Sequence, residues 1–282
     1  MRPYRSVLYV PGSNVRAMDK ARTLPVDALI LDLEDAVAPD AKAQARADVC
    51  DMVQARGFGH RPLIVRINGL DTPWGGQDLD AVVSASPDAI LLPKVAHADD
   101  LLPVQRALGP DAQSRIWAMI ESPAGVLNAA TIARADGMEG FVLGTNDLAK
   151  DLGARDRADR LPLQGALSMA LLAARAAGIL CIDGVYNAFR DEDGLRQECL
   201  QGRDMGFDGK TLIHPAQLAV ANEVFAPAPA AVDLARRQVD AYEAALASGA
   251  GVAVLDGRIV ENLHVEAARQ TLAKADTIAR MD

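Results

Sequence analysis

The stretch that decides the fold is DALILDLED, residues 27–35. It begins with a nearly continuous apolar run of strand length, which is typical of a strand buried on both faces of a parallel sheet. Two-residue alternation puts Asp32 and Glu34 on the face of Ile30, while the leucines take the other face. Because a buried strand rarely carries charge without a reason, acids at its carboxyl end indicate a functional site there.

Apolar runs of strand length recur along the chain, and helical patterns follow them. The other runs are 6–10, 62–67, 88–92, 115–121, 139–144, 179–183 and 209–213, and examples of the helical patterns are 42–56, 99–108, 163–177 and 193–205. Eight such units in about 225 residues match an α/β chain folded as a (β/α)8 TIM barrel, whose usual size is about 250 residues. We therefore expect a barrel over 1–226. A doubly wound open sheet is the alternative, but it usually has fewer strands and a Gly-rich first turn.

The pattern changes near Pro227. An Ala-rich segment, 232–246, predicts a helix. Two short apolar runs then flank Asp256-Gly257, a strong type I′ hairpin signal, and a last helical pattern follows. We expect 227–282 to form a C-terminal helical and hairpin extension that acts as a lid or as an oligomerisation arm.

Composition excludes several classes of protein. The chain has 282 residues, 29 Lys and Arg against 38 Asp and Glu, a formal charge of −9, 50% apolar residues and 4% aromatic residues. This balance excludes a disordered chain and disfavours nucleic-acid binding. No apolar segment reaches the roughly 18 residues of a membrane span. Three cysteines without a CxxC pair suit a reducing compartment, so we expect a cytoplasmic protein without membrane or nucleic-acid partners.

Charged residues recur at the carboxyl ends of the expected strands, which is where barrel active sites form. They are Asp32, Glu34, Asp35, Arg66, Lys94, Glu121, Asp147 and Asp183. Exposed loop residues beyond each strand are the alternative interpretation. The chain has no HExxH or GxSxG motif, and Gly209-Lys210-Thr211 lacks the first glycine of a P-loop. Carboxylates with one arginine favour Mg²⁺ and a metal-assisted enolate reaction on a small acid.

Cations also gather near the N-terminus of this acidic chain. They are Arg2, Arg5, Arg16, Lys20 and Arg22, and Pro11-Gly12-Ser13 opens the first expected helix among them. A helix start with cations nearby is suited to an anion, so a phosphate-bearing ligand such as coenzyme A is one interpretation. A solvated basic surface is the other.

Seven motifs follow one another in a fixed order: RSVLYVPGSN, LDLEDAVAPDAKAQAR, VRINGLDTPW, LPKV, MIESPAGV, LGTNDLAKDLG and GKTLIHPAQ. Together they resemble the citrate lyase beta subunit-like (CitE-like) family of the aldolase/citrate lyase superfamily, which includes malyl-CoA and citramalyl-CoA lyases. The resemblance covers essentially the whole chain. It implies a barrel with a C-terminal lid, a homotrimer or hexamer, and Mg²⁺-dependent cleavage or formation of a C–C bond in 3-hydroxyacyl-CoA compounds.

The resemblance also implies roles for individual residues. Glu121 and Asp147 correspond to the Mg²⁺ ligands, and Arg66 to the group that holds the 2-oxo acid and its developing oxyanion. Glu34 and Asp35 correspond to residues behind the metal that order its waters or the arginine. The structural alternatives are a salt bridge for Glu121, a helix N-cap for Asp147, and a barrel-lining ion pair between Arg66 and Glu34 or Asp35.

Other matching positions concern coenzyme A and proton transfer. Lys20 and Tyr9 match positions that touch coenzyme A in malyl-CoA lyases, whereas Asn14 stands where an arginine is frequent. Asp35 stands where related CoA-free aldolases have a histidine base, which disfavours that activity. Glu261 stands where CoA lyases often have an aspartate that reaches a neighbouring subunit as an acid or base; a carboxylate at a helix start is its structural alternative.

The expected function is therefore a Mg²⁺-dependent acyl-CoA lyase that converts malyl-CoA or citramalyl-CoA to acetyl-CoA and a 2-oxo acid. Three alternatives remain at this point. They are a citrate lyase beta subunit that acts on a carrier-bound citryl group within a complex, a malyl-CoA thioesterase, and a non-catalytic ligand-binding barrel. The acyl chain itself stays open, because one methyl group changes binding by only about 1–3 kcal/mol.

Overall fold

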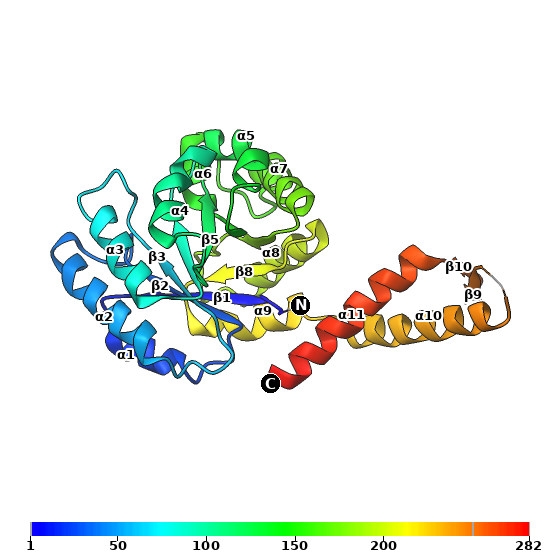
Figure 1. Cartoon of the computed structure of the whole chain (residues 1–282). Helices are drawn as coiled ribbons and strands as arrows, with labels where there is room; N and C mark the ends of the chain where they lie inside the picture. The colour runs from blue at the N-terminus through cyan, green and yellow to red at the C-terminus, as the bar shows by residue number, and fades with distance from the viewer. Residues whose placement is uncertain (1, 250, 282) are drawn as a thin grey trace. The chain divides into compact units, whose positions relative to one another are not determined.

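The computed structural model describes residues 2–249 and 251–281. Its central feature is a closed barrel of eight parallel strands that pair in sequence order (Figure 1). The strands are β1 Ser6–Pro11, β2 Ala28–Asp32, β3 Leu63–Arg66, β4 Ala89–Leu92, β5 Arg115–Ile120, β6 Met138–Leu143, β7 Leu180–Asp183 and β8 Gly209–Leu212. This confirms the predicted (β/α)8 TIM barrel, with each strand inside or within one residue of its expected run.

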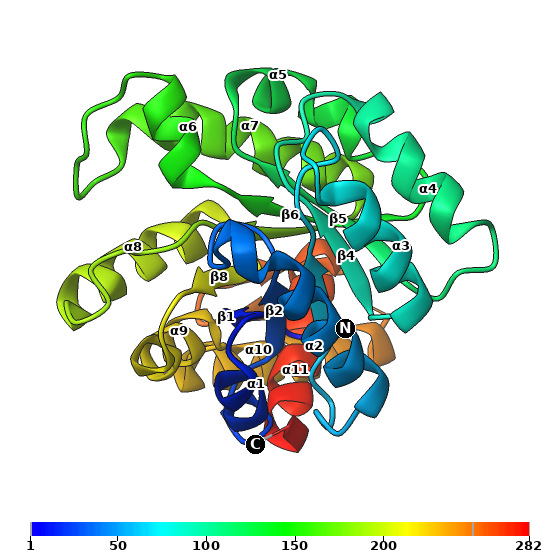
Figure 2. The same cartoon turned by 90° about the vertical axis from the view of Figure 1, so that its left-hand side faces the viewer.

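Helices connect the strands and surround the barrel (Figure 2). They are α1 Val15–Ala21, α2 Lys42–Ala55, α3 Gly75–Ala85, α4 Leu102–Leu108, α5 Pro123–Ile132, α6 Thr145–Asp151, α7 Leu161–Ala177, α8 Glu192–Met205 and α9 Leu218–Phe225. Three short 3₁₀ turns, Pro39–Ala41, Ala98–Leu101 and Pro215–Gln217, precede α2, α4 and α9.

The barrel interior is filled by one packed cluster of buried side chains that draws on seven strands. Its largest member is Trp117, which is fully buried and packs against Tyr4 with 5.5 Å between ring centroids. The indole Nε1 of Trp117 donates a hydrogen bond of 2.9 Å to Glu139 Oε2, so its polar atom is satisfied. Apolar residues on both faces of most strands explain why these sequences form a buried parallel sheet, with β8 (Gly-Lys-Thr-Leu) as an exception.

The inward face of the strands continues from the core to the functional residues, because strand side chains alternate with a period of two. Ile30, Ile64 and Met119 belong to the interior cluster. Asp32 and Arg66 lie two residues beyond Ile30 and Ile64 on neighbouring strands, where the β2–β3 register pairs them directly. The carboxyl end of the barrel therefore receives charged side chains from the same face that forms the core.

The chain divides into two compact units, Tyr4–Asn222 and a second that contains the described residues of 223–281. The second unit has helices α10 Pro229–Ala247 and α11 Asn262–Met281, joined by the hairpin β9 Ala253–Leu255 and β10 Arg258–Val260. A small apolar cluster of Ala253, Val260 and Val265 packs against α10 side chains. The hairpin turn has φ of 50° at Asp256 and 74° at Gly257, as a type I′ turn requires.

One helical stretch among the described residues, Pro215–Ala247, passes a membrane-span test based on length and composition. It combines a 3₁₀ turn, the eight-residue α9 and the 19-residue α10. Core helices of proteins that do not span a membrane pass the same test, so this result is weak evidence for a membrane-spanning segment. The absence of a membrane partner stays a prediction.

Candidate active site

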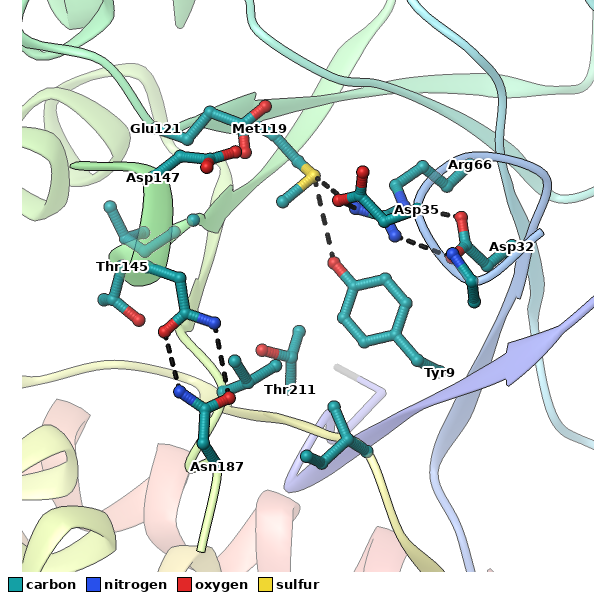
Figure 3. A pocket seen from close by; sticks show the side chains of 16 residues that line it. Tyr9, Asp32, Asp35, Arg66, Met119, Glu121, Thr145, Asp147, Asn187 and Thr211 are labelled. Carbon is teal, nitrogen blue, oxygen red and sulfur yellow. Dashed lines mark hydrogen bonds and ion pairs between the residues drawn. The ribbon is translucent and has the colours of Figure 1, made fainter. Parts of the chain in front are cut away.

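A cavity of 430 Å³ opens at the carboxyl ends of the strands (Figure 3). Its ionisable lining residues come from the ends of β1, β2, β3 and β5 and from the start of α6. They are Tyr9, Asp32, Asp35, Arg66, Glu121 and Asp147. The structure thus brings together five of the predicted site residues, from segments far apart in the sequence.

Arg66 forms one side of this cavity and is itself held by acids. Its Nε and Nη2 each lie 2.6 Å from a different oxygen of Asp32, which makes a bidentate pair. Nη1 lies 2.8 Å from Glu34 Oε2 and 3.5 Å from Asp35 Oδ2, and the guanidinium stacks 4.9 Å from the ring of Tyr9. Burial alone would lower the pKa of Arg66, but Asp32 outweighs it, and the pKa stays well above its ordinary value.

The segment after β2 holds the partners of Arg66 in place. The backbone N–H groups of Glu34 and Ala36 donate to Asp32 at 2.9 and 3.1 Å. Burial raises the pKa of Glu34 to about 7 in spite of the nearby Arg66. Asp35 differs, because 74% of its side chain is exposed at the cavity rim. Arg66 is thus an ion-paired barrel residue and a cavity-lining cation at once.

Glu121 and Asp147 face one another across another part of the cavity (Figure 3). Glu121 Oε1 accepts a 2.6 Å hydrogen bond from the backbone N–H of Lys94, whose φ of 55° lies in the left-handed region. Burial, and to a lesser degree the charge of Asp147, raise the pKa of Glu121 to about 7. Gly144 is needed here, since a Cβ would lie 2.5 Å from Glu121 Oε2.

The donor set fits a hard divalent cation. Four carboxylates line the cavity against one guanidinium, which leaves a formal charge of −3 when all are ionised. Within 2–249 and 251–281, no group of three or more His, Cys, Asp or Glu is placed to hold a metal. Glu121 and Asp147 would therefore supply two protein oxygens, and water or substrate would complete the sphere, an arrangement that Mg²⁺ accepts.

The remaining predicted residues lie in different places. Tyr9 lines the cavity, with its hydroxyl 3.9 Å from Met119 Sδ, and burial raises its pKa. Asn14 caps α1 by accepting from the N–H of Ala17 at 3.0 Å. Lys20 is exposed near the end of the same helix, and neither α1 residue belongs to the cavity lining. Glu261 belongs to the second compact unit, where it is exposed just before α11.

Several cavity residues had no predicted role. They are Met119, Thr145, Asn146, Asn187 and Thr211. Asp32 was expected at this end of the barrel, but without a role of its own. Met119 could have been found by alternation along β5, and Asn146 is part of the GTND motif. Asn187 lies four residues beyond β7 in a loop without a repeating pattern, so no sequence signal marks it.

Known proteins resemble this chain over nearly its whole length. A family model described as HpcH/HpaI aldolase/citrate lyase matches residues 5–215. A (3S)-malyl-CoA thioesterase of Cereibacter sphaeroides (strain KD131 / KCTC 12085) is 60% identical over 277 residues, which are 98% of this chain and 96% of the relative. The citrate lyase subunit beta of Escherichia coli (strain K12) is 38% identical over 284 residues, covering 98% of this chain and 94% of the relative.

A solved structure agrees with these relatives. The protein CitE from Mycobacterium tuberculosis, in complex with magnesium, acetoacetate and coenzyme A, superposes with a TM-score of 0.82 at 30% identity, covering 98% of this chain and 100% of that chain. The resemblance inferred from the seven motifs is thereby confirmed. The chain belongs to the HpcH/HpaI aldolase/citrate lyase family of enzymes.

Proposed function

We propose that the protein hydrolyses the thioester of malyl-CoA with Mg²⁺ held by Glu121 and Asp147. The observation that carries the proposal is that these two carboxylates and Arg66 line the same cavity. The chain is also 60% identical to a (3S)-malyl-CoA thioesterase. The motifs favoured a C–C lyase. The identity to the thioesterase, higher than the 38% to a citrate lyase subunit, moves our proposal to hydrolysis.

The charge of the cavity indicates that an anionic substrate binds there only together with a cation. A malyl group carries a carboxylate next to a hydroxyl, and a cavity with four acids and one arginine repels such an anion. When bound, Mg²⁺ supplies the compensating charge and Lewis acidity for oxygens of the hydroxy acid. Arg66 Nη1 lies 2.8 Å from Glu34 and 3.5 Å from Asp35 at the cavity rim, so an anionic substrate oxygen would replace one of these acids on the guanidinium.

Hydrolysis also needs a group that takes a proton from the attacking water. Water adds to the thioester carbonyl, the C–S bond breaks, and the thiolate of coenzyme A leaves with malate as the other product. We infer that a carboxylate is the base, either Asp35 at the cavity rim or Glu261 supplied by another copy in a homotrimer or hexamer. Comparing Asp35→Asn with Glu261→Gln separates the two, since only loss of the base lowers kcat without weakening substrate binding.

The coenzyme A moiety needs contacts beyond the acyl cavity. Lys20 is exposed in the last turn of α1, the helix that follows the strand carrying Tyr9. We propose that its ammonium binds a phosphate of coenzyme A, while Asn14, which caps α1, replaces the arginine frequent in related enzymes. Lys20→Ala should then raise KM for malyl-CoA and leave kcat nearly unchanged.

C–C cleavage is the second candidate function. Its support is that other CitE structures from Mycobacterium tuberculosis contain magnesium with pyruvate or with oxaloacetate, which are 2-oxo acids. A lyase acting on malyl-CoA releases a 2-oxo acid and acetyl-CoA, so a cavity suited to such an acid fits this reaction too.

The decisive experiment is incubation of the purified protein with (3S)-malyl-CoA, in Mg²⁺ or in EDTA, with products separated by mass spectrometry. We expect free coenzyme A and malate only with Mg²⁺, whereas acetyl-CoA with glyoxylate would establish the second candidate. Glu121→Gln and Asp147→Asn should each abolish turnover. Asp151→Asn, an exposed acid at the end of the same helix α6, is the matched control. Full hydrolysis by either cavity variant, or hydrolysis in EDTA, would overturn the proposal.

A further inference from the structure

Four charged side chains form a second buried group, here named the β7–β8 ion cluster: Arg160, Asp183, Glu198 and Lys210. Arg160 Nη1 lies 2.7 Å from Asp183 Oδ1. Lys210 Nζ lies 3.1 Å from Asp183 Oδ2 and 2.6 Å from Glu198 Oε1. Lys210 and Asp183 are completely buried.

None of these four residues lines the cavity described above. Their charges balance, but burying two ion pairs costs desolvation energy that hydrophobic residues would not, so stability alone is a weak reason for the cluster. Its hydrogen bonds to the backbone show what it holds. Lys210 Nζ donates to the carbonyl of Gly184 at 2.5 Å, and Asp183 Oδ1 accepts from the N–H of the same glycine at 2.8 Å. The peptide groups on both sides of Gly184 are thus fixed by the cluster.

Gly184 in turn packs against the start of α6, the helix that carries Asp147. A Cβ on Gly184 would lie 2.6 Å from Thr145 Cγ2 and 2.9 Å from the carbonyl of Leu143, so only glycine allows this approach. Three residues further on, Asn187 exchanges two hydrogen bonds with Asn146, of 2.8 and 3.3 Å (Figure 3). The segment 184–187 therefore contacts both residues that precede Asp147.

We propose that the β7–β8 ion cluster is a positioning device that sets the place of Asp147 opposite Glu121, acting through Gly184 and Asn187. The inference rests on the proposed function, because it assumes that Asp147 holds the cation. It goes beyond that function in one respect: the β7–β8 ion cluster, which lies outside the cavity, determines how tightly the cavity binds the ion. Groups that orient metal ligands typically change affinity 10–100-fold when they are altered.

The test uses Mn²⁺ as a probe, with its binding to the purified protein measured by electron paramagnetic resonance and thermal unfolding measured in parallel. Gly184→Ala and Asn187→Ala should each weaken Mn²⁺ binding at least tenfold. Gly165→Ala is the matched control, because a Cβ there meets nothing within 4 Å, and its affinity should equal that of the wild type. A merely structural role would lower the unfolding temperature of the Gly184 and Asn187 variants and leave their Mn²⁺ affinity unchanged, and that result overturns the inference.

Two further variants examine the path from the cluster. Glu198→Gln keeps an oxygen for Lys210 but removes one buried charge, and it should also weaken Mn²⁺ binding. The double variant Gly184→Ala/Thr145→Ala removes the side-chain atoms that the new Cβ would meet, so it should regain part of the lost affinity. If Gly184→Ala does not fold, Glu198→Gln carries the test, because it alters the cluster itself, whereas Asn187 lines the cavity. Wild-type protein that neither binds Mn²⁺ nor turns over malyl-CoA refutes the proposed function. Wild-type binding with equal affinity in Gly184→Ala and Glu198→Gln refutes only the positioning role.

Discussion

Replacing Arg66 by methionine separates its structural role from its role in the cavity. Arg66 is 7% exposed, and its guanidinium holds Asp32, which is 1% exposed, by two bonds of 2.6 Å. Methionine keeps an unbranched apolar stem but lacks the guanidinium, so Asp32 would remain as a buried carboxylate without a cation. Breaking a buried ion pair on one side typically costs about 3–5 kcal/mol.

The geometry places the expected cost at the lower end of that range. Asp32 keeps its backbone donors, the N–H groups of Glu34 and Ala36, which continue to stabilise its charge. Glu34 also loses Arg66, but its pKa is already raised to about 7, so it can take up a proton near neutral pH at little cost. We therefore expect Arg66→Met to lower the free energy of unfolding by about 3 kcal/mol at pH 7.

Equilibrium urea unfolding followed by circular dichroism measures this change, and malyl-CoA turnover is followed in parallel. The double variant Asp32→Asn/Arg66→Met removes the unpaired charge, so it should recover at least half of the lost stability and still show no turnover. The reasoning is wrong if Arg66→Met costs less than about 1 kcal/mol, or if the double variant is as unstable as the single one.

Three more changes test the core, the ion cluster and a helix start. Trp117→Ala should lower the free energy of unfolding by about 3–5 kcal/mol in urea, because it empties the largest site in the barrel interior; a cost under about 1 kcal/mol contradicts that packing. Burial disfavours ionised Asp183, but Lys210 and Arg160 together outweigh it and the pKa lies below the ordinary 3.8. Asp183 therefore stabilises the fold above about pH 4, and this contribution disappears as the pH falls through its folded-state pKa. Asp183→Asn should be less stable than wild type at pH 7 and lose less stability between pH 5 and about pH 2, as acid unfolding curves would show; parallel curves would argue against it. Ser122→Ala removes the 3.1 Å bond from the N–H of Gly125 that caps α5 and should cost about 1 kcal/mol in the same urea assay, with no cost expected if the cap contributes nothing.

The barrel could be predicted from sequence because its strands are apolar on both faces. Each such run stands out against the helical periodicity that follows it, so strands such as β2, with all five residues buried, were found to within a residue or two. One helix was less regular than expected. The segment 99–108 begins as the 3₁₀ turn Ala98–Leu101 and becomes α4 only at Leu102, because Pro103 in its first turn has no N–H to continue an earlier helix.

The cavity could be predicted only where a residue's position along its strand determines its neighbours. Alternation places Arg66 and Asp32 on inward faces, but their bidentate pair depends on the register of β2 against β3, which one sequence does not reveal. Asn187 is beyond such reasoning, because its partner Asn146 is reached through a loop contact and not through strand pairing.

Asp183 and Glu121 show why a strand-end acid is an ambiguous signal. Both follow apolar strands directly, and both were natural candidates for the site. Glu121 alternates with Met119, which faces the interior, and so it reaches the cavity. Asp183 instead follows Ile182, the interior residue of β7, so its side chain turns outward to Lys210. Because these two strands are apolar on both faces, the sequence does not distinguish inward from outward positions. The same pattern therefore yields Glu121, a carboxylate of the cavity, and Asp183, a member of the buried cluster that we propose positions Asp147.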